Sequence, residues 1–129
     1  MLVAEMPTPI ESDELLGRKV IKLAAGRSHA ACITEGGELF YWGMSEYMEP
    51  ERVSTLLHTK VVDVVCGKNY TIAQGEDGNV CSYGKGKTGV LGIPNSKTLS
   101  HPQHVEALAD KKVVSMSAGY DHAACLVEE

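Results

Sequence analysis

The sequence lacks several features that would assign it to a class of protein at once. None of its apolar runs approaches the ~20 residues that a helix needs to cross a bilayer. Its first residues lack the basic segment and long apolar core of a signal peptide, so we expect none. The four cysteines form no CxxC pair, and we interpret them as reduced, buried residues of a cytoplasmic or nuclear protein. They are Cys32, Cys66, Cys81 and Cys125.

Basic residues are also scarce. Lys and Arg number 12 against 17 Asp and Glu, which gives a formal net charge of −5. A large nucleic-acid footprint needs clustered cations to displace counterions from phosphate, so this charge balance argues against one. With 43% hydrophobic and 22% charged residues, the 129-residue chain has the composition of a single globular domain.

An internal repeat is present. Three units, each opened by a proline, align without a gap inside any unit, and they span 9–49, 50–101 and 102–129. One glycine recurs in the same column of every unit. A glycine repeated in this way indicates either a special backbone angle or a close approach that a side chain would block. The three glycines are Gly26, Gly67 and Gly119.

The residues around this glycine predict strands. Before it, apolar and polar columns alternate with period two, which indicates a strand with one packed face. After it comes a run of small residues, "HAACIT", "YTIAQG" or "HAACLV", which suits a strand squeezed between neighbouring sheets. "EGG" and "EDG" then predict hairpin turns before the return strands "ELFYWG" and "NVCSYG". Each unit is therefore predicted to be a short outer segment followed by an antiparallel meander, as in a propeller blade.

The same residues resemble a known family. "AGRSHAACITEGGELFYWG" and "CGKNYTIAQGEDGNVCSYGKGKTGVLG" resemble the regulator of chromosome condensation repeat, including its closing Gly-x-x-x-x-Gly-x-Leu-Gly at 84–92. The family forms seven-bladed β-propellers, so the resemblance implies an all-β fold of tandem four-stranded blades and an incomplete segment of about three blades. The chain departs from the family pattern in three places. The first unit lacks the closing glycines, Tyr70 replaces the histidine of the other units, and the third unit stops before its return strand.

Two motifs match the patterns of a metal site and of a dinucleotide-binding site, but the residues around them do not support either function. His29 with Cys32 and His122 with Cys125 each form His-x-x-Cys, but residues three apart on a strand point to opposite faces, so we predict no metal site. We expect both histidines to be largely buried and hydrogen-bonded between blades. "GKGKTG" at 84–89 matches a dinucleotide-binding pattern, but the Gly and Pro that follow forbid the required helix, and we predict no cofactor.

No catalytic constellation of nucleophile, base or paired carboxylates can be argued from the sequence, so we predict that the protein is not an enzyme. The carboxylate of Asp63, in a polar column of its strand, is expected to be exposed.

The residues that vary on the repeated frame are the candidate partner-binding residues. Repeat scaffolds display recognition surfaces by changing turn tips on a constant framework. Two tip residues follow the repeated glycine in each unit, and the loop after the first unit adds residue types common at protein contacts. The candidates are Arg27, Ser28, Lys68, Asn69, Tyr120, Asp121, Met44, Tyr47 and Met48.

The sequence thus favours a non-catalytic protein–protein interaction module, with no membrane partner expected. The family resemblance implies two alternatives: part of a guanine-nucleotide exchange factor for a small GTPase, or the substrate-recognition propeller of a ubiquitin ligase. No long insertion resembles the wedge that exchange factors use, and a chromatin role ranks third because the chain is acidic. Unpaired strands at the end of an incomplete propeller also predict self-association, or completion by another chain.

Overall fold

The computed structural model describes residues 15, 17–43, 47–53, 60–84, 99–105, 108, 111–119 and 122–128. These residues form strands and turns, with no α-helix among them, and they contain no helix long and apolar enough to cross a membrane. The strands are β1 (Val20–Ala25), β2 (His29–Thr34), β3 (Leu39–Gly43), β4 (Tyr47–Arg52), β5 (Val61–Cys66), β6 (Tyr70–Gly75), β7 (Val80–Gly84), β8 (Leu99–His104), β9 (Lys112–Ala118) and β10 (Ala123–Glu128).

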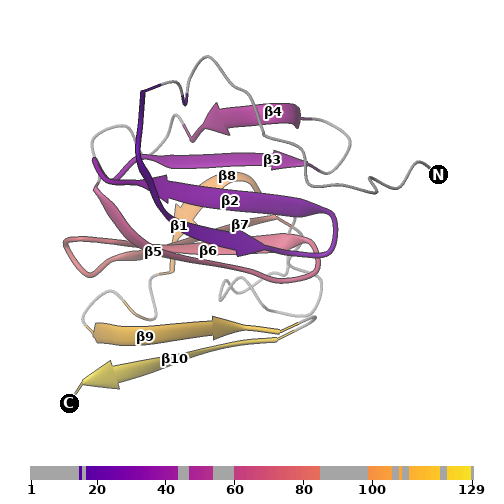
Figure 1. Cartoon of the computed structure of the whole chain (residues 1–129). Helices are drawn as coiled ribbons and strands as arrows, with labels where there is room; N and C mark the ends of the chain where they lie inside the picture. Colours follow the sequence, from indigo (N-terminus) through magenta and orange to yellow (C-terminus); the bar gives the residue numbers. More distant parts are fainter. Residues whose placement is uncertain are drawn as a thin grey trace.

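The strands build three antiparallel sheets in chain order. The first sheet contains β1 to β4, the second contains β5 to β8, and the third contains β9 and β10. Figure 1 shows the sheets lying one beside the next, with β5 of the second sheet close to β1 of the first. The all-β prediction is confirmed, and so is the prediction of tandem four-stranded units with an incomplete last one.

The repeat extends to the irregularities of the sheets. The first strand of each sheet carries a shift in register at the same column, between Val20 and Lys22 in the first sheet and between Val61 and Asp63 in the second. In the third sheet, Leu126 pairs with Ser115 and Val127 pairs with Val113, so the extra residue is Val114 of β9, in the same column. A bulge bends a strand and increases its twist, so the same bulge repeated gives the sheets the same curvature.

The fourth strand of each complete sheet comes from the next sequence unit. β4 contains Pro50 and pairs with β3, and β8 contains Pro102 and pairs with β7. Just beyond these strands, the amide of Val53 donates to the carbonyl of Leu39 at 2.9 Å, and the amide of Val105 donates to that of Val80 at 2.8 Å. A unit opened at its proline therefore begins on the outer edge of the preceding sheet and then builds its own.

Apolar side chains fill the spaces between the sheets. The larger cluster joins the first and second sheets and contains Ala31, Ile33, Leu39, Val53, Val61, Val64, Ala73 and Cys81. A smaller one, between the second and third sheets, contains Val80, Val105 and Val113. Full burial of each aliphatic side chain stabilises the fold by roughly 1.5–3 kcal/mol. The small residues of β2 and the even burial of Ala31, Cys32 and Ile33 agree with a strand packed on both faces.

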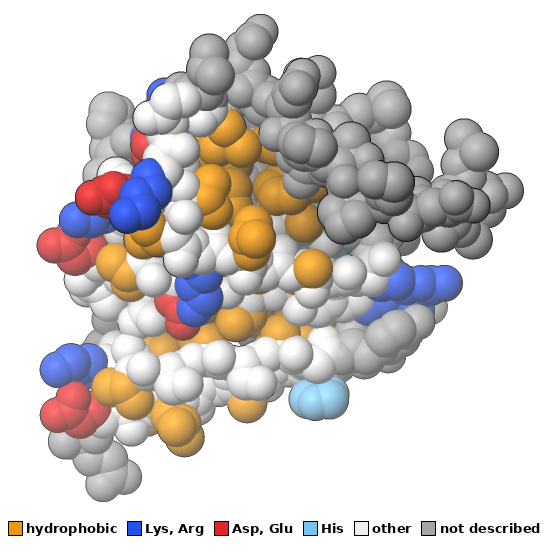
Figure 2. Space-filling model, in the orientation of Figure 1, with side chains coloured by type: hydrophobic (Ala, Val, Ile, Leu, Met, Phe, Trp, Pro, Cys, Tyr) orange, Lys and Arg blue, Asp and Glu red, His pale blue; other side chains and the backbone are white. Residues whose placement is uncertain are grey.

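On the outer faces of the first and third sheets, side chains in these columns are exposed, because no neighbouring sheet among the described residues covers them. Val64 is 1% exposed against the first sheet, whereas Leu23, in the same column of the first sheet, is 69% exposed. Ile33 is fully buried against the second sheet, whereas Leu126, its counterpart in β10, is 65% exposed. Figure 2 shows the resulting apolar side chains along β9 and β10 at the lower edge of the molecule.

Three sequence predictions are wrong for this reason or a related one. His122 and Cys125 were expected to be buried, but both are exposed, because the described part of the third sheet has only two strands and no sheet beyond it. Asp63 was expected to be exposed, but it is half-buried and forms an ion pair with Lys22 of the first sheet. Residues of opposite charge stand in the same column of neighbouring units, and this is the signal that would have predicted the pair.

Candidate functional site

The turns after the three repeated glycines form the frame of the candidate site. In each turn the glycine amide donates to the carbonyl of the residue three positions later: Gly26 to His29 at 2.8 Å, Gly67 to Tyr70 at 2.9 Å, and Gly119 to His122 at 2.7 Å. This bond holds a tight turn whose two middle residues form its tip. The three turns are therefore built alike, whatever residues occupy the tips.

Glycine is required at the start of these turns because an aromatic ring lies against it, and not because of a positive φ. A Cβ at Gly67 would collide with the ring of Tyr70, and one at Gly119 would collide with the ring of His122. At Gly26 it would meet both the ring of His29 and the carbonyl of Gly67 in the second sheet. The ring at the start of the second strand lies over the glycine in all three turns.

The tips of the first two turns lie side by side. The hydroxyl of Ser28 donates to the side-chain oxygen of Asn69 at 3.5 Å, across the boundary between the first and second sheets. Arg27 and Ser28 are exposed, and Lys68 and Asn69 are half-buried. Figure 2 shows basic side chains gathered at this right-hand end of the molecule, where the β1–β2 and β5–β6 turns of Figure 1 lie.

The other candidate residues are placed only in part. Met44, Tyr120 and Asp121 lie outside the described residues. Tyr47 and Met48 belong to β4, of which the backbone is described at these positions. The structure therefore brings together four of the predicted residues, those at the tips of the first two turns.

Hydrogen bonds between sheets hold the turns in place. Nε2 of His29 lies 3.0 Å from the carbonyl of Tyr70 and 3.1 Å from the hydroxyl of Thr71, both in the second sheet. A carbonyl only accepts, so Nε2 carries the proton of a neutral ring. Burial lowers the pKa of His29, and the bond to Tyr70 opposes this in part. The expectation that His29 bonds between blades is confirmed, although its other ring nitrogen is buried without a partner in the described part of the chain.

The buried thiols and phenol beside this contact are unsuited to nucleophilic chemistry. Burial raises the pKa of Cys66 to about 11, and its sulfur lies 3.8 Å from the hydroxyl of Thr71. Burial also raises the pKa values of Cys32, Cys81 and Tyr83. A protonated thiol is a poor nucleophile, so these groups contribute packing.

No metal-binding cluster of three or more His, Cys, Asp or Glu side chains occurs within the described ranges. His29 reaches the second sheet, while Cys32, three residues along the same strand, is not part of the cluster packed there. The "GKGKTG" motif lies outside the described residues after Gly84.

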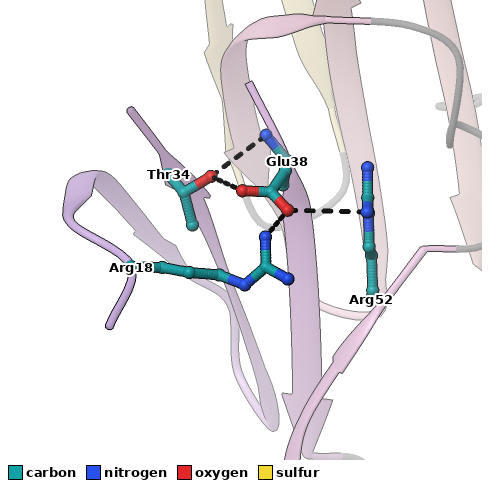
Figure 3. Close-up of polar contacts among 4 residues, drawn as sticks. All are labelled: Arg18, Thr34, Glu38 and Arg52. Carbon is teal, nitrogen blue, oxygen red and sulfur yellow. Dashed lines mark hydrogen bonds and ion pairs between the residues drawn. The ribbon is translucent and has the colours of Figure 1, made fainter. Parts of the chain in front are cut away.

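A second polar cluster, which the sequence did not indicate, stands at the opposite ends of β2 and β3. The carboxylate of Glu38 forms ion pairs with Arg18 and, at 3.5 Å, with Arg52 of β4, and it accepts a hydrogen bond from Thr34 at 2.8 Å (Figure 3). The guanidinium of Arg18 also stands 5.7 Å from the centre of the Phe40 ring. The cluster ties the outer strand to the hairpin within one sheet, so we assign it to stability.

The sheets are antiparallel meanders that pack on one another through strands of small and apolar residues, and the first two are each closed by a strand from the next unit. This arrangement is that of a segment of a β-propeller. The chain belongs to the regulator of chromosome condensation (RCC1) repeat family. Two models of that repeat match it, at residues 20–47 and 77–126.

The chain is similar to parts of longer proteins. The chain is 34% identical over 128 residues to the human E3 ubiquitin-protein ligase HERC2 and 30% identical over 135 residues to the ultraviolet-B receptor UVR8 of Arabidopsis thaliana. These alignments cover 89% and 96% of this chain, but only 3% and 30% of the two relatives. The crystal structure of Prp20p from Saccharomyces cerevisiae has a TM-score of 0.78 at 16% identity, over 87% of this chain and 32% of that one.

Proposed function

We propose that this RCC1-type segment is a non-catalytic protein–protein interaction module and that it binds its partner through the turn tips at 27–28 and 68–69. One observation carries the proposal: the hydroxyl of Ser28 meets the side chain of Asn69, so tips from different repeats form one continuous surface. The frame beneath the tips is constant, while the tip residues differ between repeats. This combination is how repeat scaffolds vary recognition without changing the fold.

The chemistry of the surface favours an acidic partner. Each tip carries one cation, Arg27 in the first and Lys68 in the second, within a chain whose net charge is −5. Local positive charge on an acidic protein steers a partner to one place, because the rest of the surface repels anions. The buried, protonated thiols and the lack of a metal cluster in the described residues fit a role in binding.

A charge-matched pair of variants tests this proposal. Arg27→Ser with Lys68→Ser removes two charges from the tips, and Lys19→Ser with Lys111→Ser removes two exposed lysines elsewhere. For a partner obtained by affinity capture, we expect the tip variant to weaken binding at least about tenfold at unchanged thermal stability, since central cations are common binding hot spots. Equal affinities for the two double variants would contradict the proposed surface.

Nucleotide exchange on a small GTPase is the second candidate function. The solved Prp20p structure resembles this chain, and Prp20p binds Gsp1p and histones. Release of a fluorescent GDP analogue from a small GTPase such as Gsp1p, with and without this chain, distinguishes exchange from simple binding. If the chain is a non-catalytic interaction module, the release rate should stay unchanged.

A further inference from the structure

A side chain that can gain a proton closes the contact between the first and second sheets, which we call the first junction. His29 begins β2, and its Nε2 lies 3.0 Å from the carbonyl of Tyr70 and 3.1 Å from the hydroxyl of Thr71, both on β6. The two sheets are complete, with four strands each, so the strands on both sides of His29 are present. The geometry at this junction is therefore set by the described strands themselves.

The contact between the second and third sheets, the second junction, uses the same sequence column with a different residue. Here the hydroxyl of Tyr70 lies 2.5 Å from the carbonyl of His122 and 2.7 Å from that of Gly119. The Tyr70 carbonyl that accepts from His29 is the counterpart of the His122 carbonyl. The donor is therefore an imidazole at the first junction and a phenol at the second. Of these two groups, only the imidazole ordinarily changes its charge between about pH 5 and 8.

The first junction accommodates neutral His29 and not its protonated form. A carbonyl only accepts, so Nε2 carries the single proton of the neutral ring. Protonation adds a second N–H at Nδ1, an atom that is buried and has no hydrogen-bond partner among the described residues. A buried donor without an acceptor is costly, and a buried positive charge adds to that cost. The protonated ring is therefore more stable where it leaves the junction and reaches water.

The groups around His29 supply no negative charge that would hold the protonated ring in place. Burial keeps the thiol of Cys66 protonated by raising its pKa to about 11, and burial also raises the pKa of the Tyr83 phenol. Across the same junction, Lys22 and Asp63 neutralise each other. The groups nearest to the ring or to its hydrogen-bond partners are neutral or positive. They are Gly43 on β3, Cys66 on β5, Tyr70 and Thr71 on β6, Tyr83 on β7, and Arg27 and Lys68 at the turn tips.

We propose that His29 is an acid-sensitive latch: when neutral it holds the first two sheets together beside their turn tips, and when protonated it lets them separate, whereas Tyr70 keeps the second junction closed. The tips at 27–28 and 68–69 meet at the first junction through Ser28 and Asn69, so protonation divides the surface that they form. This consequence for partner binding rests on the proposed function. The latch itself does not, and its test uses the chain alone, so a tip surface that binds no partner would leave the test unaffected.

Three amide groups report separately on the two junctions and on the sheets. The amide of Val61 donates to the carbonyl of Gly37 across the first junction, at 2.9 Å. The side-chain amide of Gln74 donates to the carbonyl of Val113 across the second junction, at 2.7 Å. The amide of Thr34 donates within the first sheet, at 3.0 Å, so it reports on the unfolding of that sheet rather than on its separation from the next. Hydrogen exchange of the 129-residue chain, followed by NMR, measures all three.

Acid should open the first junction selectively. We expect the protection factor of Val61 to fall severalfold between about pH 7.5 and 5.5, and at most about tenfold, which is the limit for an imidazole with an ordinary pKa of about 6.5 in the open state. The protection factors of Gln74 and Thr34 should stay unchanged. Equal loss at Thr34 would mean that the sheet unfolds instead of separating, and equal loss at Gln74 would mean that both junctions respond. Either result, or unchanged protection at Val61, would overturn the proposal.

Exchanging the two residues tests whether this column sets the response to acid. His29→Tyr installs at the first junction the donor that closes the second, so Val61 should lose its pH dependence. Tyr70→His should transfer the pH dependence to Gln74. Folded variants in which Val61 keeps its response, or in which Gln74 gains none, would contradict the role of the column.

A measurement on the wild-type chain does not depend on how the variants fold. The carbon-bound protons of the His29 ring report its protonation in the folded state by NMR. The protection of Val61 should fall from about pH 6.5, the ordinary pKa of histidine, down to the midpoint of this ring titration, and it should level off below that midpoint. A fall in protection that continues below the midpoint, or that begins without any titration of His29, would assign the opening to another group and overturn the latch.

Discussion

The hydroxyl of Tyr70 donates to the carbonyl of His122, 2.5 Å away in the next sheet. It also lies 2.7 Å from the carbonyl of Gly119. His29 makes the corresponding contact one sheet earlier, from its Nε2 to the carbonyl of Tyr70. One column therefore links each sheet to the next, with a histidine in one repeat and a tyrosine in another reaching the same kind of acceptor.

This contact predicts the effect of removing the Tyr70 hydroxyl. Tyr70 is 2% exposed, so Tyr70→Phe removes a buried donor that lies against the carbonyls of His122 and Gly119 in the next sheet. We expect a loss of about 1–2 kcal/mol in the free energy of unfolding, measured by urea denaturation. Tyr83→Phe is the matched control, because the buried hydroxyl of Tyr83 faces Thr71 of its own sheet and has no hydrogen bond to another sheet among the described residues, so its removal should cost less. Equal losses in both variants would show that the inter-sheet bond contributes nothing specific.

Acid should weaken the fold through His29. Burial lowers its pKa in the folded state, so the unfolded state binds a proton at higher pH than the folded state does. Neutral His29 makes its full contribution to the free energy of unfolding above the ordinary histidine pKa of about 6.5. This contribution is lost as the pH falls from there toward the lower pKa of the folded state. Unfolding free energies from pH 8 to 5 should show this decline, and His29→Gln should flatten it. A profile that His29→Gln leaves unchanged would assign the decline to another group.

The close approach at Gly67 predicts a strong effect of a single methyl group. In Gly67→Ala the new Cβ would overlap the ring of Tyr70, which is fixed by its bonds to the third sheet. We expect a destabilisation of about 1–3 kcal/mol in urea denaturation, as for other overpacked sites. The Cβ of Gly36→Ala would come no closer than 3.2 Å, to a carboxylate oxygen of Glu38, so this control should destabilise the fold less than Gly67→Ala does. A tolerated Gly67→Ala would mean that the ring can move away.

The four cysteines should differ in reactivity. Cys125 is exposed, whereas burial raises the pKa values of Cys32, Cys66 and Cys81. Thiol titration of the native chain should find one rapidly reacting group, and titration in urea should find all four. Mass spectrometry after brief alkylation should place the label on Cys125. Early labelling at Cys66 would indicate that the first two sheets separate readily.

The exposed faces of the outer sheets predict weak self-association. Leu23 and Leu126 project from the first and third sheets in columns that are buried elsewhere in the molecule. Light scattering over a dilution series should reveal association that decreases in Leu23→Lys. Val62→Lys, at an exposed position of the middle sheet, is the control and should behave like the wild type. A chain that remains monomeric at high concentration would show that these faces do not bind one another.

The sequence alone determined the strands, the hairpins and the repeat. Period-two alternation, small residues between sheets and the glycines of "EGG" and "EDG" are local signals, and Gly37 and Gly78 have the positive φ values that these turns require. The sequence also placed the turn tips at equivalent positions. Contacts within one repeat depend on nearby residues, so each copy of the pattern repeats the same information.

Only the tertiary structure decided what lies between repeats. It assigned the strands around Pro50 and Pro102 to the preceding sheets, paired Lys22 with Asp63, and gathered Glu38 with Arg18 and Arg52. It also left His122 and Cys125 exposed, although His29 and Cys32 carry the same letters. A side chain's burial is set by the sheet beside it, and that neighbour comes from residues distant in sequence, so identical motifs acquire different environments.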